Sequence, residues 1–150
     1  MKKSRVILLV LLLLVTNLSS QNIVGTWQIN SEIVGSGLNE SYRLFENGNF
    51  EFVVSQYSYL TNLVSFNGIY KIQNNQICFV ITSRKERVGT YVTQGSPAWQ
   101  GNWILEGDDI KEVKQDSVTY CFDYSLTSKE NQSILQIGNT TYYKIRKEDE

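Results

Sequence analysis

The residue types that most enzymes use for acid–base or nucleophilic chemistry are sparse in this chain. It contains no histidine, which removes serine–histidine–aspartate and cysteine–histidine catalysis, histidine zinc ligation and imidazole pH switching in their usual forms. Its 14 basic and 15 acidic residues give a net charge of −1, without the basic excess that binding of a phosphate backbone usually needs. We therefore predict that the protein is not an enzyme and that it binds no nucleic acid.

Carboxylates are the remaining candidates for metal or acid–base chemistry, and their spacing favours structural roles. The acidic cluster at 106–112, which contains Asp108 and Asp109, lacks the alternating oxygen ligands of a calcium loop and fits a turn better. Asp123 falls on the polar side of an alternating segment, where an aspartate is expected to face solvent. Since no paired carboxylates, phosphate loop or activated nucleophile emerges, we predict no catalytic residue, no metal site and no cofactor.

The two cysteines, Cys78 and Cys121, allow two interpretations. In an oxidising compartment two cysteines normally pair. However, both alternate with apolar neighbours and should point away from the core, and the 42 residues between them are expected to hold at least three strands of a sequential meander. At about 4.8 Å per strand the two sites would lie beyond the ~7 Å limit for a disulfide. The sequence leaves the pairing open.

The first twenty residues have the character of a targeting segment. A basic start at 2–5 precedes an unbroken apolar run of ten residues from Val6 to Val15, and small polar residues follow as far as Ser20. The apolar run falls well short of the ~20 residues that span a bilayer, so a cleaved secretory signal peptide is expected at 1–20. We predict a mature domain at 21–150, secreted or periplasmic, monomeric, with no lipid-modified cysteine and no membrane anchor.

The rest of the chain is rich in β-branched and aromatic residues, which favour strands. The clearest hairpin signal surrounds Gly48. A three-residue loop with Gly48 in the left-handed conformation places Leu44 opposite Phe50 and Tyr42 opposite Phe52, so that all four share one face. A two-residue turn would divide them between two faces. We prefer the three-residue loop.

A second hairpin is expected at the dipeptide Asn74–Asn75, since asparagine tolerates positive φ. This turn pairs Ile72 with Ile77 and Tyr70 with Phe79 on one face. The apolar stripe of the first hairpin is thereby continued.

Three further segments extend the strand pattern. The segment 101–110 repeats the layout of the second hairpin and places Trp103 on the inward stripe, whereas the charged stretch 83–100 is expected to be a solvated loop. The segment 117–125 alternates with Tyr120 and Tyr124 on its apolar face. With a final hairpin turning at Gly138–Asn139, the sequence predicts an all-β fold, an antiparallel up-and-down barrel of about 8–10 strands.

Three short motifs carry a resemblance to a known family: Gly-x-Trp at 25–27, Leu-x-x-x-Gly-x-Phe at 44–50, and Gly-x-Tyr-x-Ile at 68–72. On these motifs the chain resembles the lipocalin-like, calycin-type secreted β-barrels of Bacteroidetes. The resemblance implies that Trp27 closes one end of the barrel and stacks with Arg146 near the last strand. It also implies a ligand-binding barrel, without specifying the ligand.

Two functions remain open at this stage. The first is binding of a small hydrophobic or aromatic ligand inside the barrel. The second is a packed barrel that acts through its surface, as an inhibitor or assembly partner. Inward tyrosines favour the first function, because a buried hydroxyl without a partner costs about 1–3 kcal/mol and would be a poor choice for a filled core. The expected ligand-binding residues are Tyr42, Phe52, Tyr70, Phe79, Trp103, Tyr120 and Tyr124.

Overall fold

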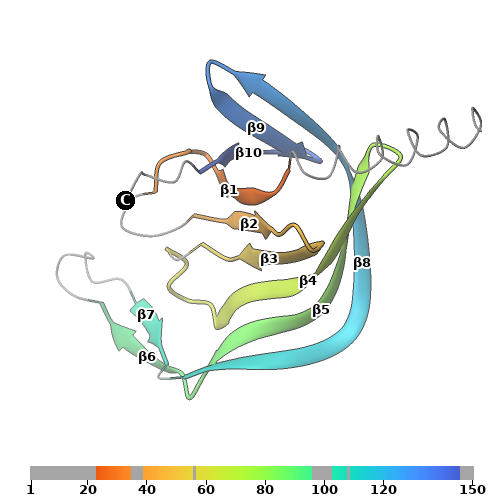
Figure 1. Cartoon of the computed structure of the whole chain (residues 1–150). Coiled ribbons are helices and arrows are strands. Elements are labelled where there is room, and N and C mark those ends of the chain that lie inside the picture. Colours follow the sequence, from red (N-terminus) through yellow and green to blue (C-terminus); the bar gives the residue numbers. More distant parts are fainter. Residues whose placement is uncertain (1–22, 35–38, 56, 96–102, 108, 146–150) are drawn as a thin grey trace, which may run out of the picture.

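A computed structural model describes residues 23–34, 39–55, 57–95, 103–107 and 109–145 (Figure 1). The predicted signal peptide at 1–20 and Arg146 lie outside this part of the chain. The prediction of an all-β fold is confirmed. The described strands are β1 (Gly25–Ile29), β2 (Ser41–Leu44), β3 (Asn49–Val53), β4 (Leu63–Gln73), β5 (Gln76–Val88), β6 (Tyr91–Gln94), β7 (Trp103–Glu106), β8 (Asp109–Lys129), β9 (Gln132–Ile137) and β10 (Thr140–Lys144).

Eight of the strands form one antiparallel sheet that closes into a ring. The order around the ring is β1-β10-β9-β8-β5-β4-β3-β2, and β1 pairs with both β10 and β2. Strands that are adjacent in the ring are therefore adjacent in sequence, except where β8 lies next to β5 and where β1 closes the ring by pairing with β10. Strands β6 and β7 pair with each other in a separate two-stranded sheet, which projects from the ring where β5 ends and β8 begins (Figure 1). The prediction of an uninterrupted meander is wrong at this one place.

The predicted hairpins lie where the turn residues placed them. Leu44 pairs with Phe50, and Gly48 in the intervening loop has a φ of +79°. The two residues of the turn Asn74–Asn75 have φ values of 50° and 62°, and the strands pair around them in the expected register. The final hairpin at 138–139 is also confirmed. Because each turn fixes its register, the apolar stripes of successive strands meet inside the ring.

The predicted hairpin at 101–110 is not formed. Strand β7 pairs with β6, so that Trp103 lies opposite Gln94, while β8 turns back to pair with β5 from Asp109 opposite Val88. The prediction of a loop for the charged stretch 83–100 is also wrong in part. Its first part is a strand instead, because β5 continues to Val88. Its charged side chains are compatible with a strand because one face of this sheet is solvated.

The side chain of Trp27 is fully buried. Its indole N–H donates a hydrogen bond to the carbonyl of Ile23 at 2.7 Å. The cation over its ring is the ammonium group of Lys144, 5.4 Å from the ring centroid. Gly25 has a φ of +137°, and a Cβ there would lie 2.8 Å from Cε of Lys144. The glycine of this motif thus leaves room for the lysine that covers the tryptophan.

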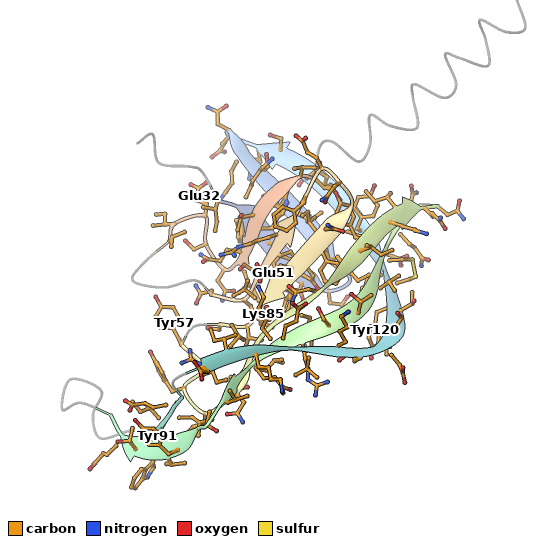
Figure 2. All side chains as sticks on the ribbon, turned by 60° about the horizontal axis from the view of Figure 1, so that its bottom comes forward. Glu32, Glu51, Tyr57, Lys85, Tyr91 and Tyr120 are labelled. Carbon is orange, nitrogen blue, oxygen red and sulfur yellow. A yellow bond between two sulfur atoms is a disulfide. The ribbon has the colours of Figure 1, made fainter. Side chains whose placement is uncertain are left out.

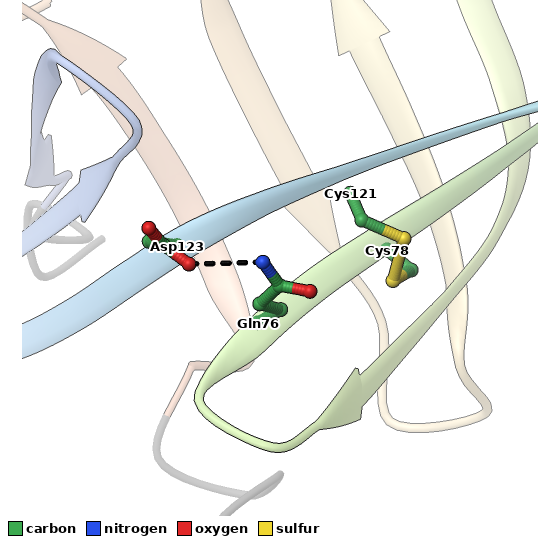
Figure 3. The surroundings of a disulfide bond; sticks show 4 residues. All are labelled: Gln76, Cys78, Cys121 and Asp123. Carbon is green, nitrogen blue, oxygen red and sulfur yellow. Dashed lines mark hydrogen bonds between the residues drawn. A yellow bond between two sulfur atoms is a disulfide. The ribbon is translucent and has the colours of Figure 1, made fainter.

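A disulfide joins β5 to β8 (Figure 3). Cys78 and Cys121 are directly opposed in the ladder, with Cα atoms 4.0 Å apart. The geometric reasoning against this bond failed because β6 and β7 leave the ring, which removes the strands expected between the two cysteines. Gln76 and Asp123 are opposed on the same face of the sheet as the disulfide, and the side-chain amide of Gln76 donates to the Asp123 carboxylate at 3.0 Å. Asp123 is exposed, so its predicted polar, solvent-facing position is confirmed.

Candidate functional site

The interior of the ring contains an apolar cavity of about 150 Å³. Its lining comes from five strands, β2, β3, β4, β5 and β8. All of the lining side chains are aromatic or aliphatic. They are Tyr42, Phe50, Phe52, Phe66, Phe79, Ile81, Tyr120 and Phe122.

The walls of the cavity are held by ring contacts. Tyr42 stacks on Phe79 with ring centroids 4.8 Å apart and an interplanar angle of 19°, and it packs against Phe52 at 4.7 Å. Phe50 meets Phe79 edge to face at 4.8 Å. Such pairs contribute about 0.5–1.5 kcal/mol each beyond area burial, so this side of the cavity is a preformed aromatic surface.

The cavity is open along β8. Tyr120 and Phe122 pair directly with Phe79 and Ile77, so all four side chains point to the same face of the sheet. Yet Tyr120 and Phe122 are 51% and 39% exposed, whereas Phe79 and Ile77 are 3% and 0% exposed. This difference arises because β9 pairs with β8 only from Tyr124 onward. Figure 2 labels Tyr120 on this strand.

The hydroxyl groups of Tyr42 and Tyr120 are the polar side-chain groups among the lining residues of the cavity. Burial, with Tyr142 and Glu40 nearby, raises the pKa of Tyr42 above its usual range. Burial and Glu40 also raise the pKa of Tyr142 to about 12, against the opposing effect of a hydrogen bond with Thr140. Both phenols stay protonated at neutral pH and can donate a hydrogen bond.

The structure brings together part of the predicted site. Tyr70 is buried in the core instead, where its hydroxyl donates to the carbonyl of Phe45 at 3.0 Å, and Tyr124 packs against the core cluster. Trp103 lies on β7 outside the ring and is 61% exposed, so its predicted inward position is wrong. The predicted residues that do line the cavity are Tyr42, Phe52, Phe79 and Tyr120.

The sequence-based site missed four lining residues, Phe50, Phe66, Ile81 and Phe122. The alternation that identified Phe52 and Tyr120 also places Phe50 and Phe122 inward, so the signal for these two was present. Phe66 was missed because β4 begins five residues before Gly68, in a stretch that no turn residue marks as a strand.

A polar cluster on the outer face is centred on Glu51. Its carboxylate accepts hydrogen bonds from Arg43 at 2.9 Å, Lys85 at 3.0 Å and Ser65 at 3.2 Å, and Figure 2 labels Glu51 and Lys85. Burial raises the pKa of Glu51, but Lys85 and Arg43 outweigh it and the net pKa is lowered. The partners satisfy the carboxylate, so this cluster joins β2, β3, β4 and β5 as a structural ion-pair network.

No group of three or more candidate metal ligands occurs in the described residues. Within the predicted acidic turn, Glu106 accepts a hydrogen bond from the Tyr91 hydroxyl at 3.1 Å, and Asp108 lies outside the described part. The same part of the chain contains no helix long and apolar enough to cross a membrane. Comparison with protein-family models, curated proteins and solved structures gives no match.

Proposed function

We propose that the protein is a secreted, lipocalin-like up-and-down barrel that binds a small apolar or aromatic ligand in its interior without catalysing a reaction. The observation that carries this proposal is the open apolar cavity, in which aromatic rings that the pairing directs inward, above all Tyr120, are half exposed. A ring that faces the core of a filled barrel would be buried.

The dimensions of the cavity limit the ligand. An apolar cavity of about 150 Å³ is large enough for a molecule of the size of benzene. Because this cavity is open along β8, a second fused ring can extend through its mouth, so the ligand presents one or two aromatic rings or a short aliphatic group. The stacked pair Tyr42 and Phe79 offers a flat surface for it. The Tyr42 hydroxyl supplies one hydrogen-bond donor for a polar substituent.

Two observations support the secreted, lipocalin-like assignment. A disulfide between Cys78 and Cys121 persists in oxidising compartments and is rare in reducing ones, in agreement with the signal peptide expected at 1–20. Gly25, Trp27 and a cation from the last strand, Lys144, are packed together, which is the arrangement that the resemblance implied for Arg146.

The packed barrel that acts through its surface remains the second candidate, and the β6–β7 sheet favours it. This sheet projects from the ring and exposes Tyr91, Val92 and Trp103. Exposed apolar groups on a projecting element are typical of contact surfaces. Ligand binding requires the cavity, whereas action through the surface requires the β6–β7 sheet.

The distinguishing experiment is a titration of the mature protein with 2-naphthol, indole and a fatty acid, followed by two-dimensional NMR. Ile81→Trp fills the cavity, and Ile110→Trp places the same side chain on an exposed position of β8. We expect saturable 2-naphthol binding that is lost in Ile81→Trp and retained in Ile110→Trp. Absence of saturable binding by all three probes in the wild type would refute the proposal.

A further inference from the structure

One edge of β8 pairs with no described strand from Asp109 to Asp123. β5 pairs with β8 from Asp109 to Asp123, and β9 pairs with it only from Tyr124 to Lys129. Among the described strands, none lies against the other edge of β8 before Asp123. Figure 1 shows this part of β8 as the outermost ribbon of the ring on that side. Such an edge can serve as a template for another extended chain.

Two hydrogen bonds show which backbone groups face this edge. The Tyr124 N–H donates to the carbonyl of Asn75, in the β4–β5 turn, at 3.3 Å. On the opposite edge of β8, the Asp123 carbonyl accepts from the N–H of Gly138, in the β9–β10 turn, at 2.8 Å. The N–H and C=O groups of successive residues point to alternate edges of a strand. Cys121 and Thr119 therefore direct their N–H and C=O groups to the unpaired edge.

The unpaired edge borders the mouth of the cavity. Tyr120 and Phe122, which alternate with Thr119 and Cys121 along β8, are lining residues of the cavity and are partly exposed. In an added strand, every second side chain would point to the same face as these two rings. One such side chain would lie over the cavity.

The part of this edge that precedes Val118 is less suited to pairing with another strand. Ile81 pairs with Val118, and Ser83, two residues further along β5, pairs with Lys114, four residues away along β8. β8 therefore carries two extra residues at this point, as in a β-bulge. Bulges and charged residues are the features that protect sheet edges from unspecific pairing, and Asp116 lies within this bulge. The accessible stretch is therefore short and suits a peptide segment better than a whole sheet.

We propose that the ligand of the cavity is an apolar side chain, of the size of a phenylalanine ring, on an extended polypeptide that pairs antiparallel with β8 at Thr119 and Cys121. This inference rests on the proposed function, since it uses the same cavity, and it adds the chemical class of the ligand. Main-chain hydrogen bonds to an edge, with side chains in adjacent pockets, form a general mode of peptide recognition.

A second copy of this chain fits the edge less well than a partner peptide. Self-pairing about a two-fold axis at Tyr120 would set Tyr120 against itself and Val118 against Phe122. The side chain over each cavity would then be Tyr120 of the other copy, a ring that already lines the cavity of its own copy. A separate peptide can place a free side chain in it.

The test uses a capped, fluorescently labelled heptapeptide, Lys-Thr-Val-Phe-Val-Thr-Lys. In antiparallel pairing the phenylalanine enters the cavity and the valine amides face β8, while the phenylalanine amide faces solvent. We expect saturable binding that weakens about tenfold or more when both valine amides are N-methylated, as loss of two hydrogen bonds implies. N-methylation of the phenylalanine amide should leave binding within about threefold, whereas replacing the phenylalanine by alanine should abolish it.

The protein variants separate the edge from the cavity. Thr119→Pro removes an N–H on the unpaired edge without removing a bond to β5, a position where sheets tolerate proline, and Thr119→Ala is the matched control. We expect Thr119→Pro to lose peptide binding but to bind 2-naphthol like the wild type, and Thr119→Ala to bind both.

Three results would overturn the inference. Peptide binding that tolerates both N-methylation patterns and Thr119→Pro would exclude backbone pairing. Binding of 2-naphthol without any peptide binding would leave the proposed function standing and remove this inference alone, whereas failure of both ligands would remove the two together. Sedimentation that shows a dimer, abolished in Thr119→Pro, would assign the edge to a second copy.

Discussion

Removal of the Cys78–Cys121 disulfide should lower the free energy of unfolding more than any single substitution on the protein surface. The bond lies on the outer face of the sheet between two long strands, so replacing both cysteines by alanine leaves no cavity in the core. The effect is expected to come mainly from the unfolded chain, which gains freedom when the cross-link is lost.

The magnitude follows from the length of the closed loop. With a sequence separation of 43 residues, the loop-closure relation gives about 13 cal/mol/K, or about 4 kcal/mol at 25 °C. This value is an upper one, because measured effects fall below it when the unfolded state keeps residual structure. We expect a loss of about 2–4 kcal/mol.

The assay is urea unfolding of the wild type, of the double alanine variant, and of the wild type with a reductant, followed by tryptophan fluorescence and circular dichroism. The reduced wild type and the double variant should shift to the same lower midpoint. A double variant that unfolds within about 0.5 kcal/mol of the oxidised wild type, the range of neutral surface substitutions, would refute the reasoning. It would mean that β5 and β8 are already held together in the unfolded chain.

The remaining predictions concern Trp27 and Lys144, the outer ion pairs and a tight backbone contact. Trp27→Ala should destabilise the protein by about 3–5 kcal/mol in urea unfolding, whereas Lys144→Met, which keeps the aliphatic cover of the ring, should cost about 1 kcal/mol or less. Glu51→Gln should cost roughly 1 kcal/mol at pH 7, since its partners Arg43 and Lys85 are well exposed. The pKa of Glu51 is lowered in the folded protein, so its ion pairs add to the free energy of unfolding above the pKa that Glu51 has in the unfolded chain, and this stabilisation is lost as the pH falls through its folded pKa. The unfolding free energies of the wild type and Glu51→Gln should therefore converge in acid. Parallel pH profiles of the two proteins would contradict this. Gly68→Ala should destabilise by about 3 kcal/mol or more, because a Cβ there would lie 1.9 Å from the carbonyl oxygen of Val80, and an unchanged midpoint would disprove that contact.

The sequence predicted the local parts of this fold well, for a physical reason. Turn residues such as Gly48 and Asn74–Asn75 adopt backbone conformations that few other residues allow, and each turn fixes the register of its two strands. The inward direction of Tyr42 and Phe79 followed from these turns alone. Register is a local property, so a local pattern is sufficient to determine it.

Strand partners across longer connections could not be predicted in this way. Trp103 repeats the pattern around Tyr70, but β7 pairs with β6, and nothing in the local alternation encodes that choice. The same failure misplaced Cys121, because the departure of β6 and β7 from the ring decides that β8 lies next to β5. The open side of the cavity was missed for a related reason, since the exposure of Tyr120 depends on where β9 ends.

The most direct test of ligand binding in the ring is the position of a bound aromatic probe. Intermolecular nuclear Overhauser effects between 2-naphthol and the aromatic protons of an isotope-labelled protein report contacts within a few ångströms. We expect contacts to Phe52, Phe79 and Tyr120, the rings that line the cavity from three strands. Contacts confined to Trp103 and Tyr91 on the projecting β6–β7 sheet, with none to the cavity rings, would contradict the proposed function and favour a barrel that acts through its surface.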